Sequence, residues 1–144
     1  MSTRQDEADI RGRIETLLAA VRGGDLEGLK PLFAPELVSF DIVPPLQHLG
    51  AEAKWKNWAD VFTFYQPPLG YEVRELTVTV GGDVAFAHSL NHVSGTLPDG
   101  GKSDYWLRWT SGWRKIDGEW FIVHDQVSVP TDFITGRSVL DLQP

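Results

Sequence analysis

Cysteine is absent from the 144-residue chain, and methionine occurs only once. Without cysteine, the protein has no disulfide, no thiolate metal site and no cysteine nucleophile. Long apolar runs are also missing, and no stretch approaches the ~20 residues that a membrane-spanning helix needs. Residues 1–13 have no apolar segment of the kind that a signal peptide carries. We therefore expect no membrane association and a cytoplasmic protein.

Positive charge is in short supply, because 13 Lys+Arg against 20 Asp+Glu give a net charge of -7. No basic stripe overrules that balance, so nucleic acid is not an expected partner. The length and the 42% hydrophobic content suit one globular domain with a real core. We predict a single domain over residues 1–144, whose C-terminal tail, residues 131–144, could lie across a neighbouring surface.

Hydrophobic periodicity divides this domain into two parts. Apolar residues recur at three- and four-residue spacings in three segments, which predicts helices at residues 6–22, 26–33 and 51–65. A short strand is expected at 36–42. Later the period changes to two, and Gly- and Pro-containing turns separate predicted strands at residues 71–80, 84–97, 102–116 and 119–129.

This order of elements is typical of an α+β fold. We predict three N-terminal helices packed on the concave face of a strongly curled, mostly antiparallel sheet, giving a cone-shaped domain. Such a cone leaves a cavity that suits a small ligand.

Aromatic residues are the most distinctive part of the composition, with six tryptophans in so short a chain. Bulky rings either fill a core or line an apolar pocket. On the third predicted helix, one face carries Trp55, Trp58, Phe62 and Tyr65. We expect this face to pack on the core, with its inner edge lining the cavity.

The segment SFDIVPP places Asp41 between two large apolar residues. A carboxylate in apolar surroundings is costly unless it is paired or used. One hypothesis is a general base that removes a proton next to a carbonyl, with its pKa raised by burial. The alternative is an acid that caps the following Pro-Pro loop through backbone hydrogen bonds.

Two strand faces mix apolar side chains with single ionisable groups, which is unusual for a buried stripe. Alternation puts His88 and His92 with Phe86 and Leu90, and puts Asp125 with Val123. Either histidine could be a donor or proton shuttle, or a satisfied core residue. Asp125 could be a second acid or base, or an ion-pair partner of an arginine. The sequence leaves open which face points inward.

The run GDLEGL…LFAPELVSFD and the ending DGEWFIVHDQVSVP resemble the ketosteroid isomerase and SnoaL-like polyketide cyclase superfamily, which shares the nuclear transport factor 2-like cone fold. The resemblance covers roughly residues 8–130 and places the isomerase's general base on Asp41. The isomerase's two oxyanion donors fall on Leu17 and near Ser111, so neither donor is kept. Limonene-type epoxide hydrolases are similar in having an acid at Asp125. Their arginine between two acids is not evident, because Arg108 has the wrong parity.

The same resemblance implies a set of cavity-lining positions. They are His88, His92, Trp109, Ser111, Trp113, Val123 and Asp125, and we expect Tyr105 and Trp109 to shape the pocket. The opposite strand face, with Trp106, Trp120 and Ile122, is apolar enough to need cover, which predicts a homodimer.

The sequence thus favours a cofactor-free isomerase or cyclase that uses acid–base chemistry on a small hydrophobic carbonyl compound. The catalytic candidates are Asp41, His88 and Asp125, and we expect no metal and no cofactor. The alternative is a non-catalytic ligand-binding or oligomerisation module of the same fold, because one fold hosts many functions.

Overall fold

The elements follow the predicted order, with the long strands after the last helix. The structure is a computed structural model that describes residues 2–144. Its helices are α1 (Thr3–Arg22), α2 (Leu26–Leu29), the 3-10 turn η1 (Lys30–Leu32) and α3 (Ala51–Phe64). Its strands are β1 (Phe33–Phe40), β2 (His48–Leu49), β3 (Gln66–Gly81), β4 (Val84–Thr96), β5 (Lys102–Ile116), β6 (Glu119–Ser128), β7 (Thr131–Asp132) and β8 (Arg137–Ser138). No helix within residues 2–144 is long and apolar enough to cross a membrane.

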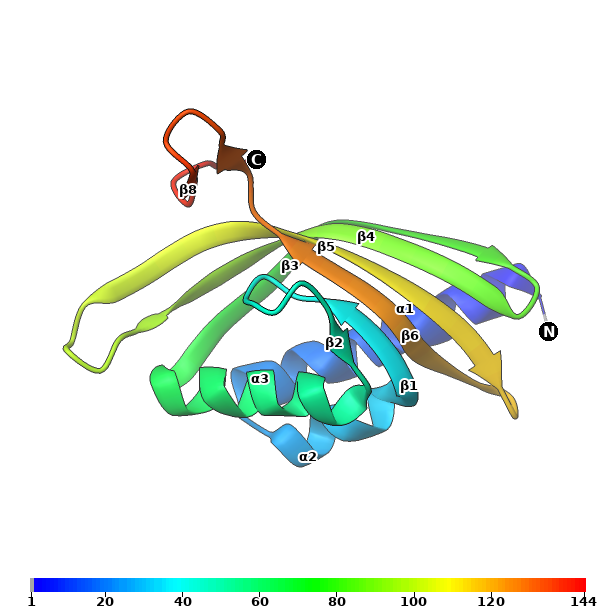
Figure 1. The fold of residues 1–144 in the computed structure, drawn as a ribbon. Coiled ribbons are helices and arrows are strands. Elements are labelled where there is room, and N and C mark those ends of the chain that lie inside the picture. Colours follow the sequence, from blue (N-terminus) through cyan, green and yellow to red (C-terminus); the bar gives the residue numbers. More distant parts are fainter. Residues whose placement is uncertain (1) are drawn as a thin grey trace.

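Six strands form one curled sheet, and the helices lie on its concave side (Figure 1). The strand order is β2-β1-β6-β5-β4-β3. Every neighbouring pair is antiparallel except β1 and β6, which run parallel. The predicted α+β cone with a mostly antiparallel sheet is confirmed.

Helix α1 supplies one side of the core. Its predicted apolar stripe is buried throughout and consists of Ile10, Ile14, Leu17, Leu18 and Val21. Polar contacts fix the start of the helix on the sheet, since Asp6 accepts hydrogen bonds from Lys115 at 2.9 Å and from the Trp120 indole at 3.2 Å. Side chains therefore fill the part of the concave face that α1 covers.

A β-bulge in β6 changes which side chains point inward. Residues 122 and 124 pair with adjacent residues of β5, so Val123 between them is the extra residue. Trp120 and Ile122 before the bulge, and Asp125 after it, are all buried. The expectation that Trp120 and Ile122 belong to an outer dimer face was wrong, because they are 2% and 0% exposed in the core. A face assignment based on strict two-residue alternation fails after a bulge, because the bulge adds one residue to the strand.

The C-terminal tail stands away from the domain. Strands β7 and β8 form a small hairpin that projects beyond the end of β6 (Figure 1). Local backbone hydrogen bonds close it, from Gly136 to Asp132 at 2.7 Å and from Val139 to Pro130 at 2.8 Å. The tail thus makes its own turn, and does not lie across a neighbouring surface of this chain as the sequence allowed.

Candidate functional site

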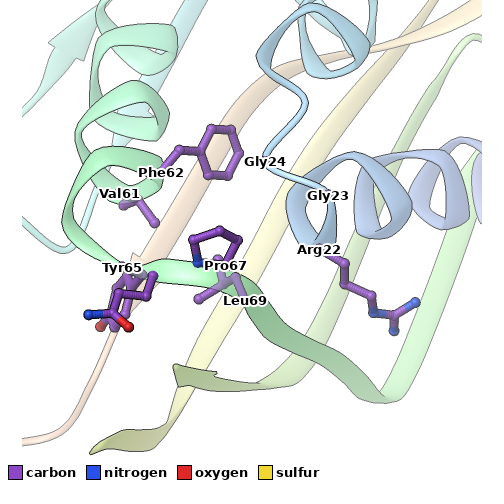
Figure 2. Close-up of a pocket in the computed structure, with 9 residues that line it drawn as sticks. Arg22, Gly23, Gly24, Val61, Phe62, Tyr65, Pro67 and Leu69 are labelled. Atoms are coloured by element: carbon purple, nitrogen blue, oxygen red, sulfur yellow. The ribbon is translucent and has the colours of Figure 1, made fainter. Parts of the chain in front are cut away.

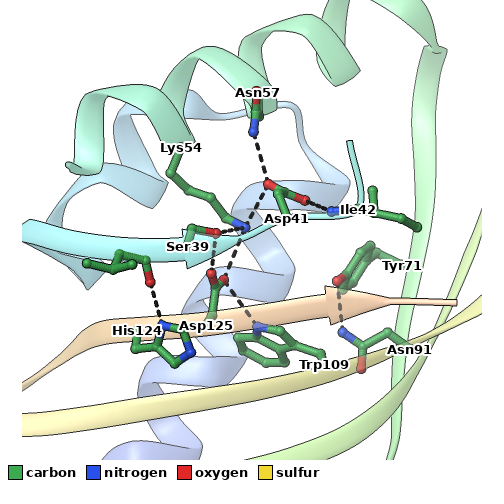
Figure 3. A network of polar contacts seen from close by, with 11 residues as sticks. Ser39, Asp41, Ile42, Lys54, Asn57, Tyr71, Asn91, Trp109, His124 and Asp125 are labelled. Carbon is green, nitrogen blue, oxygen red and sulfur yellow. Dashed lines mark hydrogen bonds and ion pairs between the residues drawn. The ribbon is translucent and has the colours of Figure 1, made fainter. Parts of the chain in front are cut away.

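A lysine ammonium lies between two carboxylates beneath α3 (Figure 3). The Lys54 Nζ is 3.0 Å from Oδ2 of Asp41 and 3.1 Å from Oδ2 of Asp125. All three side chains are withdrawn from water, with exposures of 4% for Lys54, 11% for Asp41 and 2% for Asp125. Buried charges need partners of this kind, so the three groups form one electrostatic unit.

Three elements bring these groups together. Asp41 follows the last residue of β1, and Asp125 lies on β6, where the parallel pairing sets Ser39 opposite it. Lys54 sits in the first turns of α3 and points back toward the sheet. The helix period also turns Asn57 toward the sheet, three residues further on.

Hydrogen bonds hold each carboxylate in a fixed orientation. Asp41 accepts from its neighbour's backbone N–H at Ile42 (2.7 Å) and from the Asn57 amide (3.1 Å). Asp125 accepts from the Ser39 hydroxyl at 2.5 Å and from the Trp109 indole at 3.4 Å. Both acids therefore have their oxygens occupied by donors besides the lysine.

The balance of burial and charge sets the ionisation of this unit. Burial alone would raise the pKa of Asp41, but the Lys54 charge and the hydrogen bonds from Lys54, Ile42 and Asn57 outweigh it and lower that pKa. Burial opposes the charge on Lys54, yet the two carboxylates raise its pKa above the ordinary value. The predicted upward shift of the Asp41 pKa was wrong, because the sequence did not reveal the lysine.

A pocket opens on the Asp41 side of this unit. It encloses about 80 Å³. Asp125 is absent from its lining and reaches it only through Lys54. The lining residues come from the segment after β1, from α3 and its C-terminal end, and from strands β3 to β6. They are Asp41, Ile42, Lys54, Asn57, Trp58, Val61, Tyr65, Leu69, Tyr71, Val93, Tyr105, Leu107 and Val127.

A chain of hydrogen bonds orients Tyr71 in the wall of this pocket. The Ser89 hydroxyl donates to the Asn91 carbonyl at 2.7 Å, and the Asn91 amide donates to the Tyr71 oxygen at 2.8 Å. Within residues 2–144 the Tyr71 O–H has no hydrogen-bond acceptor of its own. Burial raises the pKa of Tyr71, so the phenol keeps its proton. Tyr71 can therefore donate to a ligand.

Trp58 supplies a second unused donor. Its ring meets the Tyr71 ring edge-on, with centroids 6.1 Å apart, and both residues line the pocket. The indole N–H is buried and finds no acceptor in the part of the chain that the structure describes. A buried donor without a partner is costly, and an acceptor on a bound ligand would remove that cost.

The structure brings together only some of the candidate residues. Asp41, Trp58 and Tyr105 line the pocket, and Asp125 lies behind Lys54. The other candidates lie around the pocket. In the core, Trp109 donates to Asp125, and the Trp113 indole donates to the Ser111 hydroxyl. Trp55 lies under the Lys30 ammonium, Phe62 lines a neighbouring pocket, and Val123 lies in the bulge.

Both strand histidines were assigned to the wrong face. Burial alternates along β4 so that Ser89 and Asn91 are buried, whereas His88 is exposed and His92 is half-buried on the outer face. His92 stacks on Trp106 with ring centroids 4.7 Å apart and contacts Asp104 at 2.7 Å. Neither histidine reaches Asp41. The inward-facing set of β4 is instead Ala85, Ala87, Ser89, Asn91 and Val93, which are all buried.

Sequence reasoning missed Lys54, Asn57 and Tyr71. The aromatic stripe of α3 predicted that Trp55 faces the pocket. The face that lines the pocket is displaced from this stripe by one residue and includes Lys54. One signal was present: Lys54, Asn57, Trp58 and Val61 recur at helical spacing in the sequence. A lysine at such a position is normally placed in solvent, which is why that signal was passed over.

Comparison with known families agrees with this fold. The SnoaL-like domain matches residues 10–132, which is most of the chain. The chain belongs to the SnoaL-like family. No curated protein matches it.

Several solved structures are similar over most of their length. An NTF2-like protein of unknown function from Pseudomonas putida KT2440 is 34% identical, with a TM-score of 0.89, and the match covers 100% of this chain and 99% of that one. A nuclear transport factor 2 superfamily protein from Salmonella enterica is 22% identical, with a TM-score of 0.81 and coverage of 96% and 100%. A ketosteroid isomerase-like protein from Erwinia carotovora atroseptica is 20% identical, with a TM-score of 0.71 and coverage of 84% and 93%. The last two likenesses show the fold alone.

Proposed function

We propose that the protein is a cofactor-free enzyme that moves protons on a small hydrophobic carbonyl compound, as an isomerase or a cyclase does. One observation carries this proposal. Asp41 is the only carboxylate in the pocket lining, and it shares that lining with Tyr71 and Trp58, whose donors are unused. A fixed base beside free donors is the arrangement that enolate chemistry requires.

The reaction starts at Asp41. Its carboxylate removes a proton from the carbon next to the substrate carbonyl. The C–H electron pair forms a carbon–carbon double bond, and the C=O π pair moves to the oxygen as an enolate forms. Tyr71 donates a hydrogen bond to that oxygen, with Trp58 as a second donor. Asp41 then returns the proton to another carbon in an isomerisation. In a cyclisation the enolate carbon attacks a second carbonyl, and the resulting alkoxide takes the proton.

The ion pair limits which carbons can react. Because Lys54 and Asn57 lower the pKa of Asp41, its carboxylate is a weak base. A weak base is best matched to an acidic carbon, such as one between two carbonyl groups or one flanked by a carbonyl and an alkene. We therefore expect a β-dicarbonyl or a β,γ-unsaturated ketone as substrate.

Asp125 has a different role in this proposal. It does not line the pocket, and it holds the Lys54 ammonium from the far side at 3.1 Å. We assign it as a positioning residue that acts through Lys54. His88 has no role, because it is on the other face of the sheet.

Isomerisation of cyclohex-3-enone to cyclohex-2-enone, followed by absorbance and by deuterium uptake in D₂O, tests the proposal. The Asp41→Asn variant should lose about 10²–10⁴ in rate. The exposed Asp60 on α3 lies outside the pocket lining, so Asp60→Asn is the matched control and should keep the parent rate. An Asp41→Asn variant as fast as the parent removes Asp41 as the base. A parent rate equal to that of buffer rejects an enzyme for this substrate class.

A non-catalytic ligand-binding or oligomerisation module is the second candidate. The lowered pKa of Asp41 favours it, because a carboxylate fully engaged by Lys54 and Asn57 has little base strength left. Native mass spectrometry of the purified protein separates the two candidates. An unaltered small molecule retained in every preparation supports the module, whereas conversion of added enone supports the enzyme.

A homodimer remains part of the proposal, with a revised interface. The outer sheet face still carries apolar side chains, including Phe86 at 50% exposure and Val84 at 54%. Light scattering after size-exclusion chromatography distinguishes a dimer from the 16.1 kDa monomer.

A further inference from the structure

A second pocket adjoins the one that holds Asp41. It lies between the C-terminal ends of α1 and α3 and the start of β3, and Figure 2 shows the Phe62 ring beside Gly24 with Pro67 beneath it. We call it the outer pocket, and we call the pocket lined by Asp41 the inner pocket. The outer pocket encloses about 190 Å³, more than twice the volume of the inner one.

Three side chains line both pockets. Val61, Tyr65 and Leu69 form the partition between them. The partition rests on Gly95 of β4, where a Cβ atom would stand 2.7 Å from Cδ1 of Tyr65 and 3.2 Å from Cδ1 of Leu69. The Tyr65 hydroxyl is also 3.2 Å from that of Ser103. The two pockets therefore meet at the side chains of these three residues.

Volume decides how a ligand can use this arrangement. An engineered protein cavity of about 150 Å³ holds one benzene molecule. At about 80 Å³ the inner pocket is too small for a ring together with a carbonyl group, while the outer pocket at about 190 Å³ has room for a ring. A ligand larger than a few heavy atoms must therefore leave part of its body outside the inner pocket.

The outer pocket has the chemistry to receive that part. Phe62, Pro67 and Leu69 present apolar surface to it, and the Arg22 side chain extends away from them (Figure 2). The Arg22 guanidinium donates to the Tyr71 backbone carbonyl at 2.8 Å. At the far end, Gly24 and its neighbours are exposed to solvent, so a ligand can reach the pocket from there.

We infer that the two pockets are the two ends of one binding channel for an elongated ligand. Its carbonyl end lies in the inner pocket against Asp41, and its apolar ring or chain crosses the Val61–Tyr65–Leu69 partition into the outer pocket. This inference rests on the proposed function for the chemistry of the carbonyl end. It adds the class of substrate, a carbonyl compound with an apolar body of at least ring size.

Binding of two methyl ketones, acetone and acetophenone, tests the channel by calorimetry, without any requirement for turnover. Gln66 lines the outer pocket but not the inner one, so filling the outer pocket with Gln66→Trp should leave acetone binding unchanged. It should weaken acetophenone binding by about tenfold to a hundredfold, the value of one excluded ring. Thr63→Trp, an exposed change on α3 outside both linings, is the control. Circular dichroism and thermal melting check that each variant is folded.

Each result has one meaning. Acetophenone that fails to bind the parent, or that binds Gln66→Trp as tightly as the parent, overturns the channel. So does a loss of equal size in Thr63→Trp. Nuclear Overhauser contacts place the ligand independently, and the channel requires the acetophenone ring to contact Phe62 while its methyl group contacts Tyr71. If these contacts appear but Asp41→Asn leaves enone isomerisation unchanged, the channel stands and the proposed function fails.

Discussion

Replacing Lys54 with methionine should destabilise the protein more than any other single charge removal in the site. The substitution keeps an unbranched side chain as far as the Cε position but leaves Asp41 and Asp125, 11% and 2% exposed, without their shared cation. Each N–O contact near 3 Å is worth about 5 kcal/mol at an effective dielectric constant of about 20. Desolvation of the charges offsets much of this, and removal of one partner from a buried pair typically costs about 3–5 kcal/mol. We expect that loss in the free energy of unfolding at pH 7.

The pH dependence of the free energy of unfolding should also change sign in Lys54→Met. In the parent, the pKa of Asp41 is lowered on folding, so its contribution is present above the unfolded value of about 3.9 and is lost as pH falls through the lower folded value. Without Lys54, the main effect that offsets the desolvation of Asp41 is gone, so the pKa of Asp41 in the folded state should rise above its unfolded value. Protonation then favours the folded state. The variant should gain stability as pH falls from 7 toward about 4, where the parent does not.

Urea unfolding followed by tryptophan fluorescence measures both effects. Lys56→Met, an exposed change two residues along α3, is the matched control and should shift stability by less than about 0.5 kcal/mol. Adding Asp125→Asn to Lys54→Met should recover part of the loss, because one unpaired carboxylate is removed. Equal stability of Lys54→Met and Lys56→Met, or a loss that grows as the solution is acidified, would refute the buried three-charge unit.

Four further predictions concern the pocket and its surroundings. A methyl group at Gly95 would crowd Tyr65, so Gly95→Ala should lower the free energy of unfolding in urea by about 1–3 kcal/mol; an unchanged value would mean that Tyr65 is free to move. Tyr71→Phe strips a buried amide of its acceptor and should cost about 1–3 kcal/mol as well as slowing isomerisation; a normal rate would exclude Tyr71 as the oxyanion donor. His88→Ala should leave the rate unchanged, and a large loss would return that residue to the site. Burial raises the pKa of Tyr105 to about 12, so Tyr105→Phe should not alter the ultraviolet titration below pH 11, and a missing lower step would contradict that burial.

Local pattern was enough for the architecture. The stripe of α1, from Ile10 to Val21, is buried as the helical period requires, because burial of one helix face follows directly from residue spacing. The change to a two-residue period after α3 likewise identified the long strands. Asp41 stood out as a carboxylate between apolar residues, and it lines the inner pocket.

Local sequence pattern could not show which face of each strand points into the core. The same alternation describes both faces of β4, and only the tertiary fold buries Asn91 and exposes His88. The bulge residue Val123 reverses which alternate residues of β6 point inward, and the sequence period does not predict the bulge.

The sequence by itself determined a curled sheet with helices on its concave side and a carboxylate at the end of the first strand. Only the tertiary structure decided which charges surround that carboxylate and therefore how it ionises. Lys54, 13 residues away along the chain, joins Asp41 to Asp125, 84 residues away, because α3 folds across the one parallel strand pair. The ionisation of a buried group depends on the charges nearest to it in space, and those neighbours come from segments that no local period connects.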